Sequence, residues 1–207
     1  MPGVLYAYTI MSSIVKVESD THPRKFSISH YPDELDQCFL DIFAWFQDHA
    51  EALDIKKIRG ADSEDIKALK KAFSGSIPLP MITLLKSHDG GIYFEEFEGL
   101  SATAILRKSE RCAKMFDDWR EDWIPFAEDV DENLLVVDSK GKVRSWDTDE
   151  EIFEKDTVAK SFATFLEDYR NKLCSGRMEF IEEVGVVECT SSPVKHTGGG
   201  AASKYAD

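Results

Sequence analysis

Apolar residues recur at a spacing of three or four in five stretches of this chain, as they do on the buried face of a helix. Several of these stretches begin with a residue that suits a helix start, such as Ser63, Ser101 or Pro80. The pattern predicts helices at 33–53, 63–73, 80–89, 102–119 and 161–173. On the fourth helix, the residues expected to face inward are Ile105, Cys112, Met115, Phe116 and Trp119.

Shorter apolar or alternating runs between these helices predict strands at 92–97, 123–127, 134–138 and 143–147. Pro125 has no backbone N–H to donate, so its strand must lie at an edge or carry a bulge. Gly141 supplies the turn between the last two strands. Residues 178–189 fit either a strand or an extension that binds a partner, and 191–207 have the composition of a flexible tail.

Strands clustered between helices and joined by hairpins indicate an α+β fold, in which helices cover an antiparallel sheet. A length of 207 residues suits one domain with some appended sequence. We expect that domain at 33–173. An N-terminal extension would occupy 1–32, and a partly flexible C-terminal extension would occupy 174–207.

Four segments follow one another along the chain: IPLPMITLLKSHDGG (77–91), GIYFEEF (91–97), WIPFAEDVDENLLVVDSKGKVRSWD (123–147) and SFATFLEDYRNKL (161–173). In this order they resemble the SUKH superfamily, which includes the Smi/Knr-type regulators of cell-wall synthesis, and the likeness spans roughly 33–173. One departure is Glu132, which precedes Asn133 where the family usually has glycine. This departure leaves the geometry of that loop open.

The resemblance implies a non-catalytic module that binds proteins. Members of the superfamily include immunity proteins that neutralise toxins. Others are eukaryotic scaffolding subunits that regulate cell-wall synthesis or join larger complexes. The resemblance does not decide between these roles.

The chain is strongly acidic, with 39 Asp and Glu residues against 25 Lys and Arg residues and a formal net charge of -14. This balance argues against binding to nucleic acid, which needs a basic face. It favours a protein partner with a basic surface, because complementary charge speeds encounter and fixes orientation. Solubility alone is the alternative explanation of the charge.

The four cysteines, Cys38, Cys112, Cys174 and Cys189, are far apart and signal neither a zinc site nor a disulfide framework. They fit a reducing compartment, so we expect a cytoplasmic protein. The apolar start at 1–11 lacks a preceding basic residue and is too short to span a bilayer, so no membrane association is expected. Met11 is a candidate alternative start.

Catalytic and metal-binding motifs are largely missing from the sequence. The segment Asp129-x-Asp131-x-Asn133 opens like a calcium loop, but Leu134 and Lys140 occupy positions that need glycine and glutamate. His88 beside Asp89 is a candidate base for a hydrolase. An interaction of His88 with the last carbonyls of its helix is the favoured interpretation. We therefore expect no enzyme activity, no metal and no cofactor.

The candidate partner-binding residues are Trp119, Asp129, Asp131, Glu132 and Trp146. They lie between Phe116 and Asp156, a segment with 15 acidic and 5 basic residues. Tryptophan is common at binding hot spots, and carboxylates around it suit a basic partner. The alternative is that the tryptophans belong to the core and the acids form a solvated face.

Three functional hypotheses follow from the sequence. The first is an intracellular scaffolding module that holds a basic protein partner, either alone or as a subunit of a larger assembly. The sequence leaves the oligomeric state open. The second is an immunity protein that blocks the active site of a basic nuclease toxin. The third is a hydrolase built on His88 and Asp89, which requires a concave pocket beside the double glycine at 90–91.

Overall fold

The computed structural model describes residues 32–189. The expected start at Met11, residues 1–31 of the expected N-terminal extension (1–32) and the flexible tail at 191–207 lie outside these described residues.

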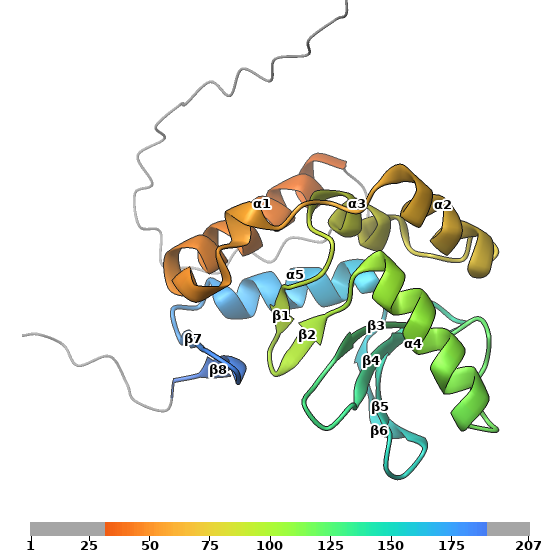
Figure 1. Ribbon diagram of the computed structural model, residues 1–207. Coiled ribbons are helices and arrows are strands. Elements are labelled where there is room, and N and C mark those ends of the chain that lie inside the picture. The colour runs from red at the N-terminus through yellow and green to blue at the C-terminus, as the bar shows by residue number, and fades with distance from the viewer. Residues whose placement is uncertain (1–31, 190–207) are drawn as a thin grey trace, which may run out of the picture.

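The five predicted helices are all present (Figure 1). They are α1 (Pro32–His49), α2 (Ser63–Ala72), α3 (Leu79–Ser87), α4 (Ala102–Met115) and α5 (Phe162–Leu173). The prediction that the first helix continues to residue 53 is wrong. The chain instead makes two 3-10 turns, Glu51–Leu53 and Ile55–Lys57, joined by Asp54 in a left-handed conformation with φ of 43°.

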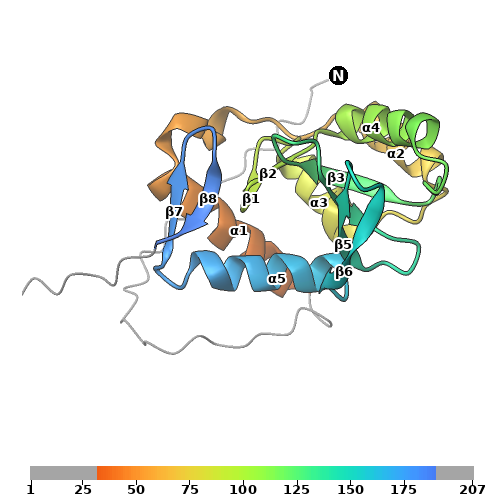
Figure 2. The same cartoon turned by 90° about the horizontal axis from the view of Figure 1, so that it is seen from below.

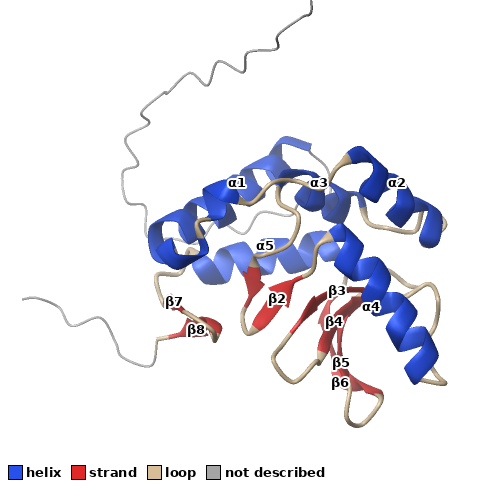
Figure 3. Cartoon of the chain, in the orientation of Figure 1, coloured by secondary structure: helices blue, strands red, loops and turns tan. Residues whose placement is uncertain are grey.

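Six strands form one antiparallel sheet in sequential order, which confirms the α+β fold (Figure 3). They are β1 (Tyr93–Phe94), β2 (Phe97–Gly99), β3 (Ile124–Glu128), β4 (Leu134–Val137), β5 (Val143–Asp147) and β6 (Ile152–Ala159). The register of β3 shifts between Pro125 and Ala127, which is the bulge expected at that proline. The run expected as one strand at 92–97 turns at Glu95 and divides into β1 and β2.

The sheet carries apolar side chains on both faces, and β4 shows how they are divided. Leu135 and Val137 point into the larger core, which includes residues of α1, α3 and α5. Leu134 and Val136 point the other way, into a smaller cluster closed by Cys112 of α4. Every residue of β4 is therefore buried, as expected for a central strand covered on both sides. Figure 1 shows α4 crossing this second face of the sheet.

The double glycine connects α3 to the first strands at a point of close backbone contact. Gly90 and Gly91 have φ of 83° and 70°, in the left-handed region. A Cβ on Gly90 would lie 2.8 Å from the backbone nitrogen of Ser101. The carboxylate of Asp89 accepts a hydrogen bond of 2.6 Å from the N–H of Ala102, at the start of α4. A side chain at Gly90 would therefore separate the end of α3 from the start of α4.

A second antiparallel pair, β7 (Met178–Ile181) and β8 (Gly185–Glu188), occupies the segment expected to be a strand or an extension. Figure 2 shows this hairpin beside the end of α5 and apart from the main sheet. The N–H of Val186 donates a hydrogen bond of 2.9 Å to the carbonyl of Glu95 in the β1–β2 turn. The ring of Phe180 packs edge-on against Tyr93, with centroids 5.5 Å apart. The hairpin is thus fastened to the β1 edge of the sheet.

Candidate partner-binding site

The β3–β4 loop, residues 129–133, is held in one conformation by the side chain of Asp129. Its carboxylate accepts hydrogen bonds of 2.9 Å and 2.8 Å from the backbone N–H groups of Asp131 and Asn133. It also accepts one of 3.0 Å from the side-chain amide of Asn133. A carboxylate used in this way shapes its own turn and is less available to a partner.

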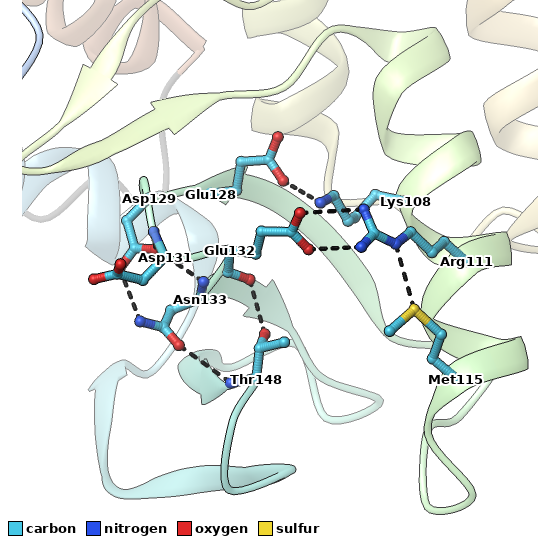
Figure 4. Close-up of polar contacts among 9 residues, drawn as sticks. All are labelled: Lys108, Arg111, Met115, Glu128, Asp129, Asp131, Glu132, Asn133 and Thr148. Carbon is cyan, nitrogen blue, oxygen red and sulfur yellow. Dashed lines mark hydrogen bonds and ion pairs between the residues drawn. The ribbon is translucent and has the colours of Figure 1, made fainter.

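Asn133 and Thr148 join this loop to the β5–β6 turn (Figure 4). The side-chain oxygen of Asn133 accepts a hydrogen bond of 3.1 Å from the N–H of Thr148. The hydroxyl of Thr148 donates one of 2.8 Å to the carbonyl of Glu132. Two turns whose contacting residues are 15 positions apart in sequence therefore lie side by side at one end of the sheet.

The two joined turns gather seven carboxylates, which we call the acidic rim. Its members are Asp129, Asp131, Glu132, Asp147, Asp149, Glu150 and Glu151. Asp131, Asp149 and Glu150 are exposed, and their side chains make no hydrogen bond or ion pair with any other described residue. Among the described residues near the rim, Arg111 is the cation that contacts it. The rim therefore presents surplus negative charge to solvent.

Arg111 of α4 faces Glu132 across the gap between helix and loop (Figure 4). Their closest atoms are 2.8 Å apart, and both side chains are about half exposed. The Nε of Arg111 also lies 3.3 Å from the sulfur of Met115. Such a pair is weak at the surface, because water screens it. It nevertheless occupies the carboxylate of Glu132 in the free protein.

Two exposed apolar side chains flank the rim. Val130, inside the braced loop, is 85% exposed, and Met115, at the end of α4, is 52% exposed. The expectation that Met115 faces inward is therefore wrong: α4 ends at this residue, and its side chain is exposed to solvent. An apolar side chain held outward by an ordered loop can anchor a partner at a lower ordering cost than one on a mobile loop.

The structure places Trp119 and Trp146 in the core and not on the surface. Their exposed fractions are 7% and 2%, and their rings pack edge-on with centroids 5.3 Å apart. Phe116 and the half-buried Trp123 complete this aromatic cluster under α4. Neither indole is exposed enough to be a surface anchor. Trp146 belongs to β5, and Trp119, which follows the end of α4, packs its ring against it. These two rings are therefore not available as surface anchors.

Of the three predicted acidic residues, Asp131 is the one whose side chain stays unengaged within the described chain. Asp129 braces the loop and Glu132 pairs with Arg111. The carboxylates of the β5–β6 turn were not among the predicted site residues, although they lie in the same acidic segment. The antiparallel order of β3 to β6 places both turns at the same end of the sheet, and the contact between Asn133 and Thr148 joins them into one surface.

His88 and Asp89 point to separate structural partners and not to one another. The His88 ring stacks on Phe43 with centroids 3.7 Å apart, and its Nδ1 lies 2.9 Å from the Ser87 hydroxyl. Burial lowers the pKa of His88, which a hydrogen bond to the Ile55 carbonyl partly opposes. Burial also raises the pKa of Asp89, whose carboxylate caps α4. The cavity beside them measures about 20 Å³, which is too small for a substrate.

Residues 32–189 contain neither a metal-binding cluster nor a membrane-spanning helix. No cluster of three or more His, Cys, Asp or Glu side chains there is arranged to hold a metal ion. No helix in the same range combines the length and apolar character needed to cross a membrane.

Comparison with known families gives a match to the SMI1/KNR4 family (SUKH-1) over residues 60–168. This match spans more than half of the chain. The chain belongs to the SUKH-1 family. A search of curated proteins found no match. Helix α1 and the β7–β8 hairpin lie outside the part that matches the SUKH-1 model.

The backbone geometry of Glu132 explains how the loop accommodates the residue that differs from the pattern of the superfamily. Glu132 stands where the superfamily usually has glycine, and its φ is 65°. The loop thus keeps the left-handed conformation that glycine adopts easily, at a cost of about 1–2 kcal/mol for another residue. The ion pair with Arg111 and the acceptance by its carbonyl of the Thr148 hydroxyl hold Glu132 in place.

Proposed function

We propose that this SUKH-1 protein is a non-catalytic module that binds a protein partner through the acidic rim. The observation that carries the proposal is the contact between Asn133 and Thr148, which gathers the carboxylates of two turns at one end of the sheet. A basic partner would be steered toward this end by charge. Val130, which projects from the braced loop, would then be covered in the complex.

Absence of catalysis is part of the same proposal. His88 and Asp89, the best candidates for a reactive pair, are used to pack α1 against α3 and to cap α4. The four cysteines are unpaired, and burial raises the pKa of Cys38 to about 12 and that of Cys112 to about 11. These two thiols are therefore poor nucleophiles near neutral pH. Free thiols also support our proposal of a reducing, intracellular compartment.

A cross-linking experiment with the full chain tests the proposal, followed by affinity measurements on the partner it identifies. The rim variant carries Asp131→Lys, Asp149→Lys and Glu150→Lys. A matched variant carries Asp36→Lys, Asp48→Lys and Asp168→Lys, which makes the same change in net charge on exposed positions of α1 and α5. We expect the rim variant to bind at least about tenfold more weakly and to lose much of its salt dependence. Equal weakening by both variants would reject the rim as the binding surface.

The identity of the partner separates the scaffolding role from that of an immunity protein. A toxin-neutralising protein would form a tight one-to-one complex with a basic nuclease and abolish its cleavage of nucleic acid. A scaffolding subunit would bind its partner without inhibiting an activity. Nuclease assays with and without the chain, repeated with the rim variant, distinguish the two roles.

A further inference from the structure

The β7–β8 hairpin leaves part of its backbone unpaired on the side that faces the main sheet. In the β7–β8 ladder, Cys189 donates a hydrogen bond of 2.7 Å to the carbonyl of Arg177. Pairs in an antiparallel ladder alternate between bonded and non-bonded, so Val187 faces β7, whereas Val186 and Glu188 turn their backbone groups away from it. The bond from Val186 N–H to the Glu95 carbonyl shows this outward direction directly.

Beyond Val186, β8 and the β1–β2 turn diverge and leave a cavity of about 300 Å³ between them. We call it the β8 slot, and its lining includes Glu95, Glu96, Lys172, Arg177, Val187 and Glu188. Neither the N–H nor the C=O of Glu188 bonds to another residue within the described part of the chain. The slot therefore borders an unpaired part of the β8 edge. This part lies next to the hydrogen bond between Val186 and Glu95.

The charges around the slot favour a basic occupant. Lys172 pairs with Glu95, and Arg177 pairs with Glu188 at 3.0 Å, so both cations are matched by carboxylates. Glu96 is exposed, and its side chain makes no contact of this kind with the described residues. The five charged groups thus leave one negative charge in excess. Val187 and the half-buried Met178 supply apolar surface between them.

We propose that the β8 slot accepts an extended, basic segment of a partner protein. The segment pairs its backbone with the outward groups of Glu188 and places a lysine or arginine against Glu96. This site is distinct from the acidic rim, since it is formed by the β1–β2 turn, the end of α5 and the β7–β8 hairpin. The proposal for the β8 slot does not depend on the function proposed for the rim.

The probe is an acetylated, amidated peptide of three Lys-Val repeats, titrated into the full chain and followed by amide NMR shifts. We expect changes at Glu95, Val186 and Glu188. The charge-reversed peptide of three Glu-Val repeats should bind at least about tenfold more weakly. Shifts confined to Asp131 and Asp149, or equal binding of the two peptides, would overturn the proposal.

A pair of substitutions at Glu188 separates the backbone contact from the side chain. Glu188→Pro removes the outward N–H and leaves the bonds to β7 in place, whereas Glu188→Ala keeps that N–H. We expect the proline variant to bind the Lys-Val peptide at least about tenfold more weakly than the alanine variant. Unchanged NMR signals from the rings of Phe180 and Tyr93, which pack against one another, would show that the hairpin remains attached to the sheet. Equal affinity of these two variants would contradict pairing at the strand edge.

Two further variants of the chain define what occupies the slot. The rim variant should bind the Lys-Val peptide as the unmodified chain does, because its substitutions lie on other elements. Loss of peptide binding in that variant would show that the peptide occupies the rim and would reject the slot. Deletion of 190–207 should leave the affinity unchanged. A tenfold gain on deletion would show that the chain's own terminus fills the slot, which would overturn the assignment to a partner.

Discussion

The side-chain oxygen of Asn133 accepts a hydrogen bond of 3.1 Å from the backbone N–H of Thr148, and this contact joins two turns of the sheet. The same asparagine donates its amide to Asp129. One partly buried side chain thus bridges the β3–β4 loop and the β5–β6 turn. The antiparallel order of β3 to β6 places both turns at the same end of the sheet, and this bridge fixes them against one another.

Asn133→Ala is expected to lower the free energy of unfolding by about 1–2 kcal/mol, because it removes both side-chain hydrogen bonds at a partly buried site. Urea unfolding measures the loss, and amide exchange at Thr148 should become faster. Thr148→Val is the control, since it removes only the exposed bond to the Glu132 carbonyl and should cost less than about 0.5 kcal/mol. Similar losses in the two variants would show that Asn133 does not bridge the turns.

Trp146→Ala is expected to lower the free energy of unfolding by about 3–5 kcal/mol, as truncation of a large core side chain does. The ring is 2% exposed and contacts Trp119 and Phe116. Ile152→Ala, on the neighbouring strand, is the comparison, because that side chain is 51% exposed and its loss should change stability by less than about 0.5 kcal/mol. A loss below about 1 kcal/mol at Trp146 would instead favour the surface role that the sequence suggested.

The sequence predicted the helices well because their apolar spacing is regular, and it predicted the bulge at Pro125 because proline leaves little choice. It did not predict β6, whose sequence IFEKDTVA mixes charged and apolar residues without alternation. That strand lies at the edge of the sheet, where most of its described side chains face solvent. Edge strands need no alternating pattern, so no periodic signal was available.

The candidate site was only partly predictable for a related reason. Acidic residues between 116 and 156 are visible in the sequence, but which of them meet depends on contacts between turns, such as that of Asn133 with Thr148. The tryptophans were ambiguous because burial of Trp119 depends on where α4 ends. Helix ends are set by tertiary packing as much as by local sequence, and here the chain leaves α4 at Met115.

Gly185→Ala is expected to detach the β7–β8 hairpin from the sheet. A Cβ at this position would lie 2.2 Å from the Glu95 carbonyl oxygen, and the φ of Gly185 is 108°. Gly176→Ala is the matched control, because it has φ of 72° but open space around the added methyl group. The control should lose only about 1 kcal/mol from backbone strain. Amide exchange at Val186 should accelerate in Gly185→Ala alone, and equal exchange in both variants would show that the close contact is not needed.

The stability of the protein is expected to fall as the pH drops below about 6.5, in part because of His88. Burial of its ring lowers the pKa of His88 in the folded state below the ordinary histidine value of 6.5. As the pH falls, the unfolded chain takes up this proton first, so acidification favours unfolding until the folded-state pKa is reached. Asp89 acts in the opposite sense. Burial raises its pKa in the folded state above 3.8, so the folded protein loses stability as the pH rises from 3.8 toward that higher pKa.

Urea unfolding of the unmodified chain and of His88→Gln at pH 7.5 and 5.5 isolates the histidine, because both proteins retain Asp89. We expect the unmodified chain to lose more stability than the variant between these two pH values. The variant should be less stable at pH 7.5, since it loses the stacking of the ring on Phe43. That absolute loss does not affect the comparison, which rests on the difference between the two slopes. Parallel pH profiles would show that the imidazole of His88 titrates equally in the folded and unfolded chains and is not held neutral by burial.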